Sequence, residues 1–583
     1  MSKRIFKVIL VKPSHYDDRG YVIQWWRSTI PSNSLASVHG ILATCAETHT
    51  LGPDVEIDIE AYDECNTIID VDGAIRRIRA AGSGFIGLVG VQSNQFPHAV
   101  DLARQFRAAN LPVVIGGFHV SGLLAMLPEP TADLKEALDL GVTFFAGEAE
   151  GRMVALLHDV DEGKMRPIYN YLGDAPGMEG AALPMLPKEV VARVAGRYTS
   201  FDAGRGCPFQ CSFCTIINVQ GRKSRYRTAD DVEAIVQANA ARGIWQFFVT
   251  DDNFARNKNW EPILDRLIRL REEGMKIRLL LQVDTLCHHT PRFIEKAGKA
   301  GCTAVFIGLE NINPESLIGA KKRQNKIWEY REMFQAWRQQ KVITWAGYIL
   351  GFPTDTPETI ARDIEIIKRE LPIDILEFFC LTPLPGSEDH KNLWTTRIPM
   401  DPDLNNYDLE HVCAPHSRMS EDEWKAIYRE AWAIYYTPEH MRTLLRRGAA
   451  TGVNLGSLVK LLMTFSLSQR LENVHPLQWG VIRLRHPSER RPGLAAESAF
   501  LFWPRLTIEI ARKTAIALAA LSRLAYQGVK ISRDQNRLKY MDQALSRASD
   551  DDADSLQLLT QTASAKQSAA HQKKVFDLTH GVG

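Results

Sequence analysis

The sequence predicts an α/β protein with two successive parallel-sheet regions followed by a helical region. Up to about residue 410, short apolar runs rich in Val, Ile and Phe alternate with helical patterns, and strand patterns cease after that point. This alternation is typical of parallel sheets with helices on their faces. The 583 residues include 70 Lys and Arg and 69 Asp and Glu, which gives a net charge of +1. This balance predicts no basic surface for nucleic acid, so we do not expect it as a partner.

The length favours several domains, because one domain usually holds roughly 100–200 residues. We predict a doubly wound Rossmann-like domain, a linker, a (β/α)6 partial TIM barrel, an α-helical domain and a polar, partly disordered tail. In that order they occupy residues 1–170, 171–199, 200–410, 411–545 and 546–583.

The first domain is predicted from a series of apolar runs with helical patterns between them. The runs lie at 5–11, 55–62, 84–91, 112–117 and 142–147. In such sheets, ligands bind beyond the carboxyl ends of the strands. The loops there read GGFHVSG (116–122) and GEAEG (147–151). Their glycines allow a large ligand to approach the backbone closely.

The barrel is predicted from a second series of runs and from the short segment before Cys207. The runs lie at 245–250, 276–283, 303–310, 342–350 and 373–381. Together these segments make about six strand–helix repeats, enough for a partial or full parallel barrel.

The last third is predicted to be helical, and one of its helices has two interpretations. Ser420 and Glu423 have the spacing of a capping box at a helix start. The apolar segment 501–521 is either a buried helix, which we favour, or an interfacial helix. No stretch reaches about 18 uninterrupted apolar residues, and the start lacks the features of a signal peptide. We therefore expect a cytoplasmic protein, with peripheral membrane contact as the alternative.

Three of the nine cysteines, Cys207, Cys211 and Cys214, fall within eight positions. The glycines and the proline around them oppose helix, so the thiols lie on a loop. Thiolates select zinc or iron–sulfur clusters. A zinc site would need a distant histidine, and a redox pair at 211 and 214 would leave Cys207 unexplained. We favour a four-iron cluster with one iron open, because reactive sites keep an open coordination position.

The pattern C-x3-C-x-aromatic-C resembles the radical S-adenosylmethionine (radical SAM) superfamily, and Phe213 is its aromatic residue. The resemblance implies that the open iron binds S-adenosylmethionine and that the [4Fe–4S] cluster cleaves it to a 5'-deoxyadenosyl radical. Cluster potentials as low as roughly −700 mV are compatible with this step. The resemblance continues through GLENINPES (308–316) and GYILGFPTDT (347–356).

By this resemblance, Glu310 contacts the cosubstrate and Phe213 lies against its adenine. The backbone of the strand end at 347–353, which includes Gly347 and Gly351, lines the adenine pocket. The residues alone also allow a salt bridge at Glu310 and a tight turn at Gly351.

Two further motifs carry chemistry-bearing side chains. The aspartates of TDDNF (250–254) follow a predicted barrel strand, where they either orient a substrate or cap the next helix. The histidines of CHH (287–289) invite a metal interpretation. We do not favour it, because two adjacent histidines rarely face one ion.

The first domain resembles the cobalamin-binding domain that precedes the barrel in one radical SAM subclass. The resemblance implies that the cobalamin tail pocket is lined by Ser93, Gly116, Gly117, His119, Gly147 and Glu150. His119 contacts the cofactor or is a hydrogen-bonded structural histidine, and a generic domain without cobalamin is the alternative for the whole region. The cobalt-ligating motif D-x-H-x-x-G is absent, as is general in this subclass.

Together these resemblances imply a methyltransferase that uses a 5'-deoxyadenosyl radical and methylcobalamin on an unactivated carbon. The expected substrate is a small, apolar molecule, lipid- or hopanoid-like or a tetrapyrrole, and the expected electron donor is a ferredoxin or flavodoxin. The alternatives are a radical SAM cyclase or oxidase without methyl transfer, and a non-catalytic cobalamin- or light-sensing protein.

Overall fold

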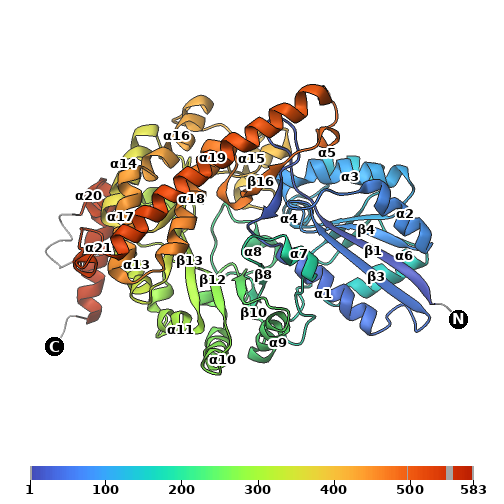
Figure 1. The fold of residues 1–583 in the computed structure, drawn as a ribbon, viewed down its shortest axis with the longest axis horizontal. Helices are drawn as coiled ribbons and strands as arrows, with labels where there is room; N and C mark the ends of the chain where they lie inside the picture. Colours follow the sequence, from blue (N-terminus) through green and yellow to red (C-terminus); the bar gives the residue numbers. More distant parts are fainter. Residues whose placement is uncertain (1–2, 496, 547–555, 581–583) are drawn as a thin grey trace.

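The computed structural model describes residues 3–495, 497–546 and 556–580, and it places two parallel sheets side by side (Figure 1). The N-terminal sheet has six parallel strands in the order β3-β1-β4-β5-β6-β7. They are β1 (Arg4–Lys12), β3 (Val55–Asp63), β4 (Gly84–Leu88), β5 (Val113–Gly116), β6 (Thr143–Ala146) and β7 (Ile168–Asn170). This confirms the Rossmann-like domain and adds β7, a three-residue strand that the sequence did not reveal.

Helices cover both faces of this sheet, and β1 shows why. Successive side chains of a strand point to opposite faces, so Phe6 and Val8 join one core and Ile9 and Val11 join the other. The first core also contains residues of α1 (Asn33–Glu47), α6 (Met153–Asp161) and α7 (Lys188–Ala192). The second contains residues of α2 (Val71–Ala81), α3 (Phe96–Ala108), α4 (Phe118–Met126) and α5 (Ala132–Asp139).

The second sheet confirms a six-stranded partial barrel, with all neighbouring strands parallel in the order β15-β14-β13-β12-β11-β8. Its strands are β8 (Tyr198–Phe201), β11 (Gln246–Val249), β12 (Arg278–Val283), β13 (Cys302–Glu310), β14 (Ile343–Leu350) and β15 (Ile375–Cys380). Its helices are α8 (Ile216–Val219), α9 (Ala229–Ala240), α10 (Trp260–Glu272), α11 (Phe293–Ala300), α12 (Pro314–Gly319), α13 (Tyr330–Gln339), α14 (Pro357–Glu370) and α15 (Glu388–Thr396). Strands β8 and β15 form the two edges, so the barrel is open.

The C-terminal region is helical, as predicted, and its first helix starts with the predicted capping box of Ser420 and Glu423. Its helices are α16 (Glu421–Tyr435), α17 (Pro438–Thr451), α18 (Leu455–Glu472), α19 (Ala499–Ser532), α20 (Gln557–Thr560) and α21 (Ala563–His580). Figure 1 shows α19 running along the side of the molecule toward the N-terminal domain. The predicted polar tail lies in part outside the described residues.

One strand contradicts the expectation that strands cease after residue 411. β16 (Gly480–Leu484) pairs antiparallel with β2 (Gln24–Ser28), near the other end of the chain. Its Arg-containing sequence has no strand partner nearby, so local patterns could not reveal it. Through this pairing, the C-terminal region contacts the N-terminal domain. No helix within the described ranges combines the length and the apolar character required to span a membrane.

Candidate functional site

The three clustered cysteines lie on the loop that follows β9 (Gly204–Arg205), at the carboxyl end of the first barrel strand. Gly206 turns the chain into this loop with a φ of +88°, and a Cβ there would lie 2.3 Å from the Lys223 carbonyl oxygen. Cys211 is buried, Cys207 and Cys214 are half-buried, and all three are free thiols. The loop therefore requires glycine before its first thiol and leaves the thiols available as ligands.

The spacing of the three thiols fits a cluster better than a lone zinc ion. Around one tetrahedral zinc, sulfur atoms lie about 3.8 Å apart, given a Zn–S bond of about 2.3 Å. Among the described residues, these sulfurs do not form a group with ligand atoms all within 4.8 Å of one another. Burial, and then Asp252, raises the pKa of Cys214 to about 12, and burial raises that of Cys207. Bound metal would hold both as thiolates, because coordination deprotonates a thiol.

Two residues that the sequence did not single out connect this loop to the predicted cosubstrate site. The Lys322 ammonium forms a buried ion pair with Glu310 and lies 5.8 Å from the centre of the Phe213 ring. The Gln324 side-chain amide donates to Cys211 Sγ at 3.5 Å. Burial alone would lower the pKa of Lys322. The negative charge of Glu310, with that of Cys211, outweighs burial, so the pKa of Lys322 is raised. The sequence offered no signal for Lys322, because Lys321 precedes it and is also basic.

The predicted cosubstrate residues lie at the carboxyl ends of β13 and β14. Glu310 ends β13 with a φ of +63°, which is rare outside glycine. Gly351 follows β14 with a φ of +104°, and its N–H donates to Asp355 at 2.9 Å. A Cβ on Gly347 would lie 2.8 Å from the Phe306 ring. Glu310 is salt-bridged and Gly351 makes a tight turn, so the structure contains both alternative roles.

Phe213 lies within the same region as these strand ends. Its ring packs edge-on against Phe352 with 6.5 Å between centroids. The backbone N–H of the neighbouring Ser212 donates to the carbonyl of Ala320 at 3.0 Å. The loop and the segment after α12 are thereby held together, and this brings Phe213 near the residue that follows Gly351.

The aspartates of TDDNF do not cap the next helix. Asp251 is buried and accepts from the Ala203 N–H at 2.7 Å and from Asn257 at 2.9 Å. Burial raises the pKa of Asp251 to about 7. The pKa of Asp252 is also raised to about 7, mainly by burial and then by repulsion from Asp251. Because Asp252 also raises the pKa of Cys207, it faces the cysteine loop.

A cavity of about 180 Å³ lies beside the N-terminal sheet and extends to the barrel. Four predicted cobalamin residues line it: Gly116, Gly117, Gly147 and Glu150. So do Asn33 and Ser37, whose buried Oδ1 and Oγ atoms have no hydrogen-bond partner. A Cβ on Gly117 would lie 2.2 Å from the Val91 nitrogen, so this wall requires glycine. The unsatisfied polar atoms and the glycine wall fit a ligand that enters the cavity.

The other two predicted residues, Ser93 and His119, face each other. His119 is buried, with Nδ1 3.1 Å from Ser93 Oγ and Nε2 2.9 Å from Asp133. Both ring nitrogens therefore have partners within the domain, which matches the structural interpretation of this histidine. Ser93 and His119 stay predictions as cofactor contacts.

The family model of the radical SAM superfamily matches residues 203–367, which include the cysteine loop and the strands through β14. Residues 203–367 therefore form a radical SAM domain. The matched segment begins directly after β8, so the thiols of the radical SAM domain are those of its first barrel loop.

Two curated relatives are named as a methyltransferase and a methylase. Bacteriochlorophyllide d C-12(1)-methyltransferase of Chlorobaculum tepidum is 27% identical over 50% of this chain and 61% of its own length. Hopanoid C-2 methylase of Rhodopseudomonas palustris is 26% identical over 49% of this chain and 53% of its own length. The chain therefore spans 61% and 53% of the length of these two relatives.

Solved structures match the radical SAM fold over more of the chain. The methyltransferase TsrM from Kitasatospora setae, solved with cobalamin and a [4Fe–4S] cluster, has a TM-score of 0.55 at 16% identity and covers 76% of this chain and 90% of its own. The cobalamin-dependent enzyme OxsB has a TM-score of 0.51 at 12% identity and covers 97% of this chain and 84% of its own. These likenesses confirm the architecture of a Rossmann-like domain joined to a radical SAM barrel.

A buried charge network joins the N-terminal domain to the radical SAM domain beside this cavity. Arg205 donates to Asp202 at 2.6 Å, to Glu148 at 2.7 Å and to Glu150 at 2.6 Å. Arg225, on β10 (Arg225–Tyr226), also donates to Glu148 at 2.7 Å. The predicted cofactor residue Glu150 is therefore held by a guanidinium two residues before Cys207.

A second contact joins the two regions at the barrel rim. His411, after β15, lies 2.9 Å from Asp408 and 3.3 Å from Asp18 of the N-terminal domain. Burial alone would lower the pKa of His411, but the hydrogen bonds to both aspartates raise it to about 11.

Proposed function

We propose that this protein is a cobalamin-dependent radical SAM methyltransferase that methylates an unactivated carbon of an apolar substrate. The observation that carries the proposal is the cavity of the Rossmann-like domain, whose wall includes Arg205 of the radical SAM domain, two residues before Cys207. One strand end thus borders both predicted cofactor sites.

The names of the relatives support methyl transfer and a large ring system as substrate. One relative is named for a bacteriochlorophyllide, a tetrapyrrole, and another for a hopanoid, a lipid. Both names specify a carbon position. We propose a substrate of this apolar class for the present chain.

The residues of this chain would divide the work of holding the cofactors. Cys207, Cys211 and Cys214 would hold the cluster, and Glu310 would contact S-adenosylmethionine, with Phe213 and the glycines of β14 near the adenine. When bound, these groups supply the radical and the methyl group, so the protein has to bind and orient them. Lys322 now neutralises Glu310 and would share that carboxylate with a cationic ligand. A ferredoxin or flavodoxin is the proposed electron donor.

The decisive experiment follows the methyl group. The reconstituted enzyme is incubated anaerobically with S-adenosylmethionine labelled in its methyl group and with an extract of cells that lack this gene. We expect 5'-deoxyadenosine and a labelled apolar product. Cys211→Ala should abolish both, whereas Cys45→Ala, a buried cysteine of α1, should abolish neither.

The alternative function predicts a different outcome of the same experiment. A cyclase or oxidase would form 5'-deoxyadenosine and a new product without label. Failure to form either, together with no iron–sulfur absorbance after reconstitution, would instead support a non-catalytic protein.

We also propose that α19 contacts an anionic membrane surface. Its exposed large apolar residues are Phe500, Leu501, Trp503, Ile508, Ile516, Leu518, Tyr526 and Val529. Its exposed basic residues are Arg505, Arg512, Arg523 and Lys530, whereas its one acidic residue, Glu509, is paired with Arg485 and Lys513. Apolar side chains flanked by cations are typical of a helix that lies in the headgroup region.

Vesicle sedimentation tests this contact. The protein should sediment with vesicles that contain phosphatidylglycerol and less with phosphatidylcholine alone. Phe500→Glu with Ile508→Glu should remove the binding, whereas Val154→Glu, at an exposed apolar residue of α6, should not. Equal sedimentation of all variants would contradict the proposal.

A further inference from the structure

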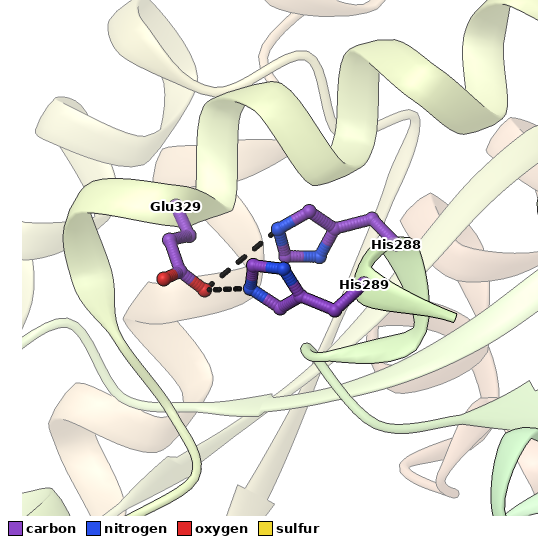
Figure 2. Close-up of side chains that lie close together, drawn as sticks. All are labelled: His288, His289 and Glu329. Atoms are coloured by element: carbon purple, nitrogen blue, oxygen red, sulfur yellow. Dashed lines mark hydrogen bonds and ion pairs between the residues drawn. The ribbon is translucent and has the colours of Figure 1, made fainter. Parts of the chain in front are cut away.

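Two histidines and a glutamate converge at the carboxyl end of β12 (Figure 2). His288 and His289 lie on the short helix η3 (Cys287–His289), and Glu329 ends η4 (Ile327–Glu329). One oxygen of Glu329 lies 2.9 Å from His289 Nε2 and 3.7 Å from His288 Nε2. All three ligand atoms lie within 4.8 Å of one another. The adjacent histidines thus do face one point, because the η3 turn folds both rings toward Glu329.

The hydrogen bond of His288 fixes which ring nitrogen carries its proton. Nδ1 lies 3.0 Å from the Thr285 carbonyl oxygen, which can only accept, so Nδ1 is the donor. Nε2 then carries a lone pair. It is buried, it has no hydrogen-bond partner, and the side chain is only 8% exposed. Metal-binding histidines commonly donate their other ring nitrogen to a backbone carbonyl in this way.

The lone pair of His288 points toward a carboxylate oxygen, an arrangement that repels unless a cation lies between them. The surrounding charges favour a cation. Glu332 adds negative potential at His288, and the Lys326 ammonium lies 3.8 Å from the other oxygen of Glu329, not from the oxygen that faces the two rings. Burial lowers the pKa of His288 and so favours its neutral form.

We propose that His288, His289 and Glu329 bind a divalent transition-metal ion of the zinc class. Two imidazoles and one carboxylate form a donor set that zinc accepts, with a fourth position left for water. Imidazole also selects against magnesium and calcium, which prefer oxygen ligands. This site is separate from the cysteine loop and goes beyond the proposed function.

The bound ion would fix two loops at the rim of the barrel. The Thr285 hydroxyl donates to Asn325 at 3.0 Å, and Asn325 donates to the Leu309 carbonyl at 2.7 Å, next to Glu310. The chain between Lys322 and Glu329 is therefore held at both ends when η3 and η4 are joined. The metal would stabilise the segment that presents Lys322 and Gln324 to the cysteines.

Metal analysis of the iron-loaded full-length protein tests the proposal. Reconstitution with iron occupies the cysteines, so zinc retained after dialysis against zinc and then against metal-free buffer belongs to another site. We expect one zinc per chain and no displacement by excess magnesium. His288→Gln and Glu329→Gln should weaken zinc binding by about tenfold or more, with iron content unchanged. The exposed His158→Gln of α6 is the matched control and should bind zinc like the wild type.

A further variant keeps the test decisive if a buried substitution disturbs folding. His289 is 55% exposed, so His289→Gln should fold normally and still lose zinc affinity. The proposal is wrong if iron-loaded wild type retains no zinc, or if His289→Gln and Glu329→Gln bind it as tightly as His158→Gln. Because zinc and iron are measured separately, these outcomes do not depend on whether the methyltransferase proposal holds.

Discussion

Removal of Arg205 should destabilise the junction between the two parallel-sheet regions more than any surface substitution. The Arg205 side chain is 9% exposed and donates to three carboxylates, those of Asp202, Glu148 and Glu150, at 2.6–2.7 Å. Arg205→Met keeps much of the side-chain volume but removes the charge and all of these hydrogen bonds.

The magnitude follows from the charge balance of the buried network. Three guanidiniums face three carboxylates, so the network is neutral. Its members are Arg205, Arg225, Arg227, Asp202, Glu148 and Glu150. Removing one cation leaves a buried net charge of −1. Leaving one buried charge uncompensated typically costs about 3–5 kcal/mol, so we expect the earliest unfolding transition to lose about that free energy.

Urea unfolding of the full chain, followed by tryptophan fluorescence, measures the effect. Arg222→Met is the matched control, because Arg222 is an exposed arginine between α8 and β10. Adding Glu150→Gln to Arg205→Met should cost less than the sum of the single substitutions, since residues of one network couple by about 0.5–3 kcal/mol. If Arg205→Met and Arg222→Met unfold at the same urea concentration, the network does not hold the two regions together and the reasoning is refuted.

Three further predictions concern other parts of the molecule. Gly351→Ala should lower stability by roughly 1–3 kcal/mol in thermal unfolding, because its Cβ would lie 1.8 Å from a ring atom of α16, whereas Gly319→Ala, with nothing within 4 Å, should not. His411→Gln should cost more stability near pH 6 than near pH 10. The folded-state pKa of about 11 lies above the unfolded value of about 6.5, so the charged ring stabilises the fold fully below pH 6.5 and loses this effect as the pH rises toward 11. A cost that does not depend on pH would contradict the ion pairing. Lys322→Met should reduce the iron retained after reconstitution, because its ammonium favours the thiolate forms, while the exposed neighbour substitution Lys321→Met should leave iron unchanged; equal iron in both would show that this charge does not matter.

The sequence was sufficient for the parts of the fold that depend on local patterns. Both sheets, their parallel strands and the capping box of α16 follow from hydrophobic alternation and short motifs, which are visible within about ten residues. The cysteine loop also follows, because its three cysteines lie within eight positions of the sequence. β2 and β16 were missed, since each is short and its partner lies at the other end of the chain.

The parts of the site that escaped prediction depend on pairs that are distant in sequence. Glu329 lies 40 positions after His289, so CHH alone gave no reason to expect convergence. Lys322 and Lys321 look alike in the sequence, and only the path of the chain after α12 turns one inward and the other outward. The role of Glu150 was predicted from its loop, but its guanidinium partner comes from the other sheet region.

The position of Arg205 has a mechanical consequence for the cysteine loop. Arg205 and Cys207 are separated only by Gly206, which packs so closely against the Lys223 carbonyl that a Cβ there would lie 2.3 Å from its oxygen. A shift of the N-terminal domain that pulls Glu148 or Glu150 must therefore move the first thiol as well. Because the cavity wall includes Glu150, we expect filling of the cavity and arrangement of the thiols to be coupled through the Arg205 side chain. Arg205→Met should therefore uncouple the filling of the cavity from the arrangement of the thiols, and iron binding should no longer respond to added cobalamin. If iron binding of Arg205→Met responds to cobalamin as in the wild type, the coupling does not run through Arg205.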